Sequence, residues 1–479
     1  MSKSDYSLNT KPKFSGVLWY LLSNIFPALS SFLIFTLSTR TISPEGLGAV
    51  ALSTTIITLL VSLSAIGFGD ALIQQQRLSD KHISSVFTLV MFLGSGLWIL
   101  SVFFTYLFGG YISEVFKHIY FFLSIRILFD VSSIVPLAML TRKMEFKAIG
   151  KRTIICSILS FIACLPLVHL KMGLMAIIVS QLTTSITSCI ILWYSLGFIP
   201  KLHFERSFYD DLKSFGLHTT FTKILGSLNI DNLCLGILGN LTTLGIYGFS
   251  KRIFSVFSDF INSALSNVSF PLFSKYQDNS KKLSNLFLSV VFLSVAVSLP
   301  VFVGSIIIAP RAIPFFFGTQ WIDAIDTVRL FFIFGFISCI GVLQLSVIKS
   351  LGRTRWVLNY QIFQQVTTGL IALIFAKYGA TTVILLIVIK TYLTWPYTIF
   401  YTSSVLNISI GEYLKNIYKP FVAVSIMYFC HFLIIDKLPE LDFLNYLVVS
   451  VFICGVIYTT SLYLMAKNEL YILLKIIRK

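Results

Sequence analysis

The chain has 479 residues, of which 56% are hydrophobic and only 12% are charged, and its mean hydropathy is +0.86. A soluble protein carries about a quarter charged residues, so this composition excludes a soluble globular fold. The net charge is +17. The sequence also contains 45 phenylalanines, which suit helices that face lipid. The composition therefore predicts an all-α polytopic membrane protein.

Apolar stretches follow one another along the chain, most of them long enough for a helix to cross about 30 Å of hydrocarbon. The first 13 residues are polar and the first apolar run is long, so we expect no cleavable signal peptide. In chain order, about 14 transmembrane helices are predicted at 15–37, 47–68, 84–107, 118–140, 152–169, 173–196, 216–236, 243–272, 283–309, 324–348, 357–376, 380–403, 420–435 and 443–466.

The placement of charge between these spans predicts their orientation. With the N-terminus inside, the cytoplasmic segments sum to +15 and the outer loops to 0, and the other +2 of the net charge lies within spans. Lys and Arg concentrate on the cytoplasmic side of membrane proteins. We therefore expect both termini in the cytoplasm, and the basic balance needs no nucleic-acid partner.

Several kinds of functional site are not expected. The seven cysteines all fall in apolar spans without a CxxC pair, and the six histidines are scattered. Free Cys in such a setting behaves as a small hydrophobe, so we expect no metal site and no cofactor. The sequence holds no GxxxxGK[ST] loop, which argues against ATP hydrolysis by this chain.

An internal repeat divides the predicted spans. The segment 41–48 opens the second span as 241–248 opens the eighth, and 138–146 leaves the fourth span as 346–354 leaves the tenth. An offset of about 200 residues predicts two six-helix lobes in the same orientation, the parallel-repeat design of alternating-access transporters. The predicted domains are an N-terminal lobe (1–206), a C-terminal lobe (207–403), and an extra helix pair with a basic tail (404–479). Residues 204–211 are expected to form an amphipathic interfacial helix.

Ionisable side chains at membrane depth are costly and point to function. Arg126 and Asp130 are four residues apart and face each other on a helix, as a cavity pair or as a clasp between helices. Asp326 and Arg329 favour the clasp, and Lys390 has no assigned role. The cationic candidates for binding an anionic substrate are Arg40, Arg126, Lys223, Lys251 and Arg252, and the acidic candidates for ion coupling are Asp70, Asp130, Asp231 and Asp259. For Lys251 and Arg252, too few acids are expected nearby.

Three motifs carry a resemblance to a known family. The segment Arg40-Thr-Ile-Ser-Pro-Glu-Gly-Leu-Gly48, the segment Gly67-Phe-Gly-Asp-Ala-Leu-Ile-Gln-Gln-Gln76 and the basic segment 138–147 resemble Wzx-like oligosaccharide flippases. These belong to the multidrug/oligosaccharidyl-lipid/polysaccharide exporter superfamily. Leu47 departs from this pattern, because an aromatic residue is expected there.

The resemblance implies a flippase, not an enzyme, in the bacterial cytoplasmic (inner) membrane. It would move undecaprenyl-diphosphate-linked repeat units from the inner to the outer leaflet, for O-antigen (lipopolysaccharide), capsule or exopolysaccharide. The implied partners are this lipid-linked oligosaccharide diphosphate, membrane lipids, and a polysaccharide polymerase with a chain-length regulator. The alternatives are a multidrug-type cation antiporter of the same superfamily and a polytopic polymerase or ligase.

Overall fold

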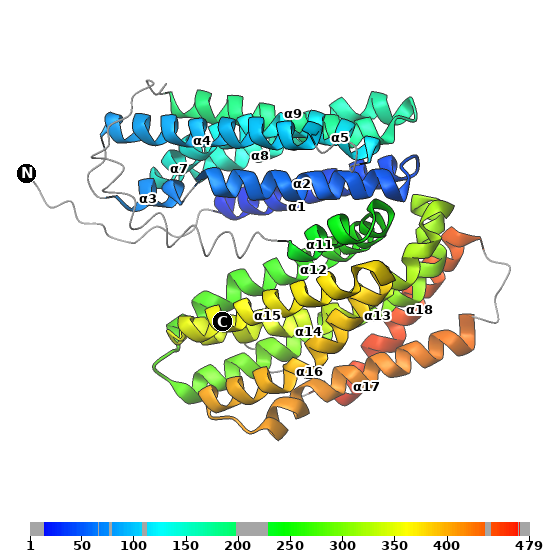
Figure 1. The fold of residues 1–479 in the computed structure, drawn as a ribbon. Helices are drawn as coiled ribbons and strands as arrows, with labels where there is room; N and C mark the ends of the chain where they lie inside the picture. The colour runs from blue at the N-terminus through cyan, green and yellow to red at the C-terminus, as the bar shows by residue number, and fades with distance from the viewer. Residues whose placement is uncertain are drawn as a thin grey trace, which may run out of the picture. The chain divides into compact units, whose positions relative to one another are not determined.

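The structure is a computed structural model that describes residues 14–65, 67–75, 79–107, 113–197, 229–435, 442–467 and 469. Every regular element in these ranges is a helix (Figure 1). Lipid offers no hydrogen bonds to the backbone, and a helix satisfies its own amides and carbonyls. The predicted interfacial helix at 204–211 and the predicted lobe boundary lie outside the described residues, as does Lys223.

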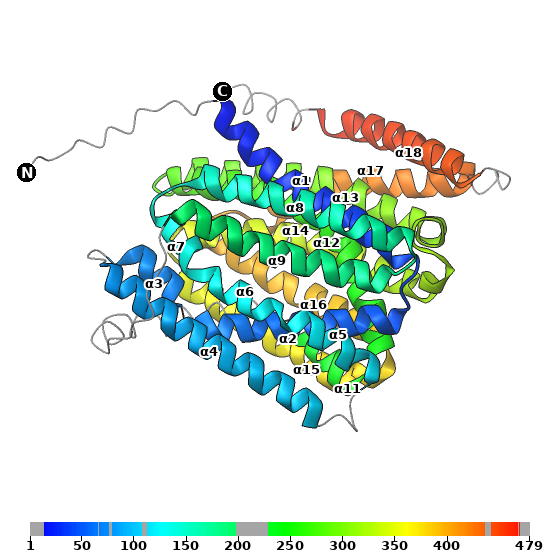
Figure 2. The same ribbon diagram turned by 90° about the horizontal axis from the view of Figure 1, so that it is seen from above.

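The chain forms two compact units, Met1–Ile42 with Ala49–Asn229 and Ser43–Gly48 with Ile230–Lys479. The first holds α1 (Phe14–Thr39), most of α2 (Pro44–Ala65), α3 (Phe68–Gln74), α4 (Asp80–Leu107), α5 (Glu114–Ser124), α6 (Arg126–Ser132), α7 (Ile134–Arg142), α8 (Phe146–His169) and α9 (Gly173–Leu196). In this unit α8 packs along α9, and α1 packs against both (Figure 2).

The second unit contains the remaining helices. They are α11 (Ile230–Leu238), α12 (Leu241–Lys275), α13 (Ser280–Phe317), η2 (Thr319–Ala324), α14 (Ile325–Ser350), α15 (Thr354–Phe375), η3 (Ala376–Tyr378), α16 (Ala380–Leu406), α17 (Ile410–Ile435) and α18 (Phe443–Met465). Its core is a continuous apolar cluster that includes Phe287, Phe292 and Ile340. The helices α17 and α18 pack against each other, and both pack against α13.

Ten helical segments in the described part are long and apolar enough to cross a membrane, so the polytopic all-α class is confirmed. The count of about 14 stays a prediction, because four predicted spans are not among the ten. The helices α12 and α15 are too polar, α1 qualifies only as a shorter apolar helix, and most of the predicted span 216–236 lies outside the described residues. The helix α17 begins at Ile410, before the start of the predicted span 420–435. Pro420 lies inside this helix and does not start it.

The predicted span 118–140 is three helices in sequence, α5, α6 and α7. Pro136 lies in the first turn of α7, where its missing N–H is tolerated. Its ring would crowd the carbonyl one turn earlier, and the helix is interrupted at Ser133, which keeps right-handed helical angles. The three helices therefore follow one another as one candidate span, Glu114–Arg142. These breaks leave Arg126 and Asp130 on a helix of only seven residues.

A short helix, α3, follows α2 and was not predicted. Its last carbonyls have no partners within the helix, and the Arg142 Nη1 donates to the carbonyl oxygens of Leu72 (2.8 Å), Ile73 (3.2 Å) and Gln75 (2.5 Å). A cation at a helix C-terminus also complements the helix dipole. Two of the motifs that carry the resemblance are therefore in direct contact.

In the second unit, the start of α2 crosses the start of α12 at two glycines. A Cβ on Gly48 would lie 1.7 Å from the Leu241 carbonyl oxygen, and one on Gly245 would lie 1.8 Å from the Pro44 carbonyl oxygen. Each helix start is capped alike. The Ser43 Oγ accepts from the Gly46 amide, and the Asn240 Oδ1 accepts from the Thr243 amide. The repeat offset is thus 197 residues here, which pairs Leu47 with Leu244.

Gly245→Ala should destabilise the protein by about 1–3 kcal/mol, because the new methyl group meets a backbone oxygen that cannot rotate away. The matched control is Gly341→Ala in α14, where nothing lies within 4 Å of the added Cβ. Ala favours a helix over Gly by about 1 kcal/mol, so the control should be as stable as the parent or more so. Thermal unfolding of the purified protein measures both, and equal unfolding temperatures would contradict the close crossing.

Candidate functional site

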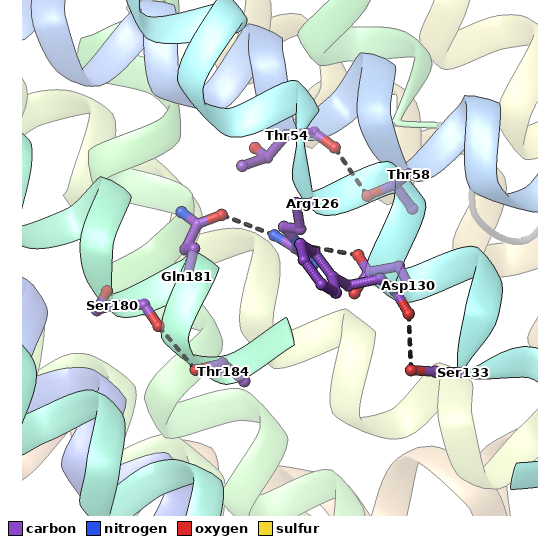
Figure 3. A network of polar contacts seen from close by, with 9 residues as sticks. Thr54, Thr58, Arg126, Asp130, Ser133, Ser180, Gln181 and Thr184 are labelled. Atoms are coloured by element: carbon purple, nitrogen blue, oxygen red, sulfur yellow. Dashed lines mark hydrogen bonds and ion pairs between the residues drawn. The ribbon is translucent and has the colours of Figure 1, made fainter. Parts of the chain in front are cut away.

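The first candidate site lies in the first unit, around Arg126 at the start of α6. The Arg126 Nε donates to the Asp130 Oδ2 at 2.9 Å, and the Nη1 donates to the Gln181 Oε1 of α9 at 2.7 Å (Figure 3). The two charged side chains are 27% and 24% exposed. The guanidinium is thus fixed by one acid and one amide, and it retains further N–H groups for a ligand.

Arg126 lines a cavity of about 350 Å³ that lies wholly within the first unit. The lining comes from α1, α6, α8 and α9. It comprises Pro27, Ser30, Ser31, Ile34, Arg126, Arg152, Thr153, Cys156, Ser157, Ser160, Ser180, Gln181, Thr184, Ser185 and Ser188. Two guanidinium groups and nine hydroxyl groups face this space, and the lining includes no carboxylate. Such a surface attracts an anion and offers hydrogen bonds to a polyhydroxylated ligand.

Two residues of this cavity were missed as site residues. Arg152 begins the predicted fifth span (152–169) but was not named as a site residue. It lies on α8, and its Nη1 donates to the Ser188 Oγ at 3.3 Å. Gln181 lies on a polar stripe of α9 that continues through Thr184, Ser185 and Ser188. The helical spacing of that stripe in an otherwise apolar span was the available signal.

The second unit contains a second charged cluster, around Asp231 of α11. The Asp231 Oδ2 accepts hydrogen bonds from the Lys251 Nζ and the Tyr247 hydroxyl, each at 2.7 Å. Asp231 is only 7% exposed, so the ion pair is largely removed from water. The expectation that Lys251 lacks a nearby acid is therefore wrong. The sequence distance of 20 residues hid the pairing, which depends on the turn between α11 and α12.

The other predicted site residues are less closely grouped. On α12, half-buried Arg252 interacts electrostatically with exposed Asp259. Arg40 is exposed in the turn between α1 and α2, and Asp70 is half-buried in the first turn of α3. Asp326 and Arg329 form the predicted clasp at 3.5 Å. Among the described side chains, no three His, Cys, Asp or Glu residues gather as metal ligands would.

The Arg126–Asp130 pair should show strong energetic coupling. Arg126→Gln and Asp130→Asn each leave one charge without its partner at membrane depth, so each should lower the unfolding temperature. The double variant should recover part of the loss, with a coupling energy of about 0.5–3 kcal/mol in a double-mutant cycle. Additive effects of the two substitutions would show that the pair contributes nothing to folding.

The sequence and the fold are similar to those of several known proteins. The chain is similar to the teichuronic acid biosynthesis protein TuaB of Bacillus subtilis, with 23% identity over 439 residues, 87% of this chain and 88% of that protein. It is also similar to the lipopolysaccharide biosynthesis protein WzxC of Escherichia coli, with 23% identity over 425 residues, 85% of this chain and 84% of that protein.

Among solved structures, the lipid II flippase MurJ in an inward closed conformation matches with a TM-score of 0.76 and 16% identity, over 95% of this chain and 100% of that one. An inward-facing multidrug transporter of the MATE family matches with a TM-score of 0.60 and 16% identity, over 82% of this chain and 99% of that one. At these identities the likeness concerns the fold alone.

The family described as "Polysaccharide biosynthesis protein" matches residues 37–326. Since this match spans more than half of the 479 residues, the chain belongs to the polysaccharide biosynthesis protein family.

Proposed function

We propose that the chain is a flippase of the bacterial cytoplasmic membrane that moves undecaprenyl-diphosphate-linked oligosaccharides from the inner to the outer leaflet. The product would feed the synthesis of a surface polysaccharide. The observation that carries this proposal is the cavity of the first unit, where Arg126 and Arg152 face nine hydroxyl groups and no lining carboxylate.

The chemistry of this cavity suits such a head group. A diphosphate is a compact anion, and Arg binds phosphate oxygens through a planar fork of N–H groups. Six of the lining hydroxyls already donate to backbone carbonyls, so they can meet sugar hydroxyls as hydrogen-bond acceptors. An organic cation, the substrate of a multidrug-type antiporter, would instead meet two guanidinium groups and be repelled.

The orientation of the chain forms part of the proposal. Both termini are placed in the cytoplasm, because the segments on that side carry the excess of Lys and Arg. The cationic residues Lys251 and Arg252 of the second unit are proposed as further contacts for the anionic substrate. Lys251 and Arg252 do not line this cavity, so Arg126 and Arg152 should contribute more.

Arg126→Ala and Arg152→Ala should each reduce surface polysaccharide by about tenfold or more, because a hydrogen bond to a charged group contributes about 1.5–3 kcal/mol. The readout is polysaccharide at the cell surface of a deletion strain that expresses each variant, with protein levels matched by immunoblot. Lys377→Ala is the control, since it removes an exposed positive charge outside the cavity. Normal export by both arginine variants would reject the cavity as the substrate site.

A drug-susceptibility assay on the same strains separates the two transporter functions. The flippase proposal expects unchanged susceptibility to cationic drugs whether or not the chain is expressed. Resistance that depends on the chain, together with unaffected surface polysaccharide, would favour the antiporter.

A further inference from the structure

Lys390 lies well inside α16, away from both ends of the helix. Its Nζ donates to the Gln364 Oε1 at 2.6 Å and to the Thr368 Oγ1 at 2.9 Å, both on α15. Both acceptors are neutral. No carboxylate among the described residues lies within 4.0 Å of the Lys390 Nζ.

This environment differs from that of the other charges at membrane depth. Asp130 is paired with Arg126, and Asp231 is paired with Lys251. In both pairs a charged donor of opposite sign lies within 3 Å of the carboxylate oxygen. Among the residues that the structure describes, Lys390 has no such charged partner.

The neighbouring elements do not change this. Five other elements pack against α16, and their charged residues are Lys251, Arg252, Asp259 and Lys275 of α12, Lys281, Lys282 and Arg311 of α13, Asp326, Arg329 and Lys349 of α14, Glu412, Lys415 and Lys419 of α17, and Lys377 of η3. The charged residue of α15 is Arg355, which is exposed near the start of the helix. The titratable group of the hydrogen-bond network on α15 is Tyr360, whose hydroxyl accepts from the Gln364 Nε2 at 2.7 Å. Within the described residues, none of these charges interacts electrostatically with Lys390.

The number of hydrogen-bond partners fits the neutral amine as well as the ammonium. An ammonium has three N–H groups, whereas two acceptors face it here. A neutral amine has two N–H groups, one for each acceptor. The orientation of the Gln364 amide is fixed by its other end, because the Nε2 also donates to the Thr394 Oγ1 at 3.3 Å.

We propose that Lys390 is a proton-exchanging site of the transporter. The N–H bond of one of the three ammonium protons breaks, the proton passes to water, and the electron pair remains on the Nζ. The amine keeps its hydrogen bonds to Gln364 and Thr368. Removing one charge from membrane depth lowers the cost of burial, so uptake and release of this proton supply a coupling step. The inference rests on the proposed function only in treating the chain as a transporter.

Solid-state NMR of the full chain in lipid bilayers, with ¹⁵N at the lysine Nζ atoms, tests the proton site directly. Lys390→Arg assigns the Lys390 resonance by removing it. The Lys390 resonance should change from ammonium to amine with a midpoint within about two units of pH 7, whereas exposed lysines titrate near about 10.4. The proposal is overturned if every lysine resonance titrates above about pH 9.5.

A second variant tests the neutral acceptors. Gln364→Glu places a carboxylate at the Lys390 ammonium and should raise the NMR midpoint by about one to three units. Gln361→Glu is the matched control, because it adds the same charge at an exposed position of α15. Its midpoint should stay near that of the parent. Equal midpoints for Gln364→Glu and the control would also overturn the proposal.

Export separates this inference from the proposed function. Arg remains charged at all physiological pH values, so Lys390→Arg should reduce export by about tenfold while the protein folds normally. Normal export with Lys390→Arg contradicts a proton step. The NMR midpoint does not depend on the substrate, so a neutral-range midpoint supports the proton site even if the Arg126 and Arg152 variants export normally and the flippase site fails.

Discussion

The cost of an ionised side chain in hydrocarbon is the constraint on which the polar architecture of this protein depends. Each such charge needs a protein partner in place of the hydration that it would have in water. Arg126 meets this need with Asp130 and Gln181, and Lys251 meets it with Asp231 and Tyr247. The Arg126–Asp130 pair lies within α6, whereas the Arg126–Gln181 contact joins α6 to α9 and the Asp231 contacts join α11 to α12. These interhelical contacts are directional, so they also help to fix the register of helices whose other contacts are apolar.

The chemical character of the cavity in the first unit depends on which charged side chains line it. Asp130 neutralises Arg126 from one side and does not line the cavity, so the space itself has guanidinium and hydroxyl groups but no carboxylate. The breaks on either side of α6 present Arg126 to α9 on a short helix. An apolar protein interior thereby includes one volume suited to a phosphate and to sugar hydroxyls, in a chain of the polysaccharide biosynthesis protein family.

Much of the fold was predictable because hydrophobic length and Lys/Arg placement act locally along the chain. Helix starts such as Pro44 and Leu241 could be located from their capping residues and the repeat. The charged contacts were predictable only when the partners are one helical turn apart, as for Arg126 with Asp130. Asp231 with Lys251 and Arg152 with Ser188 join different helices, and no periodicity encodes which helices pack together. The three-part fourth span depends on Pro136 and on packing, which a hydropathy pattern does not resolve.

The central claim is that the hydroxyl-lined arginine cavity binds the diphosphate of a lipid-linked saccharide. Its most direct test is the affinity of the purified chain in lipid nanodiscs for undecaprenyl diphosphate, compared with the Arg126→Ala/Arg152→Ala double variant. The account predicts that the double variant binds at least about tenfold more weakly, because two charge-assisted contacts are lost. Equal affinity of the two proteins would contradict it.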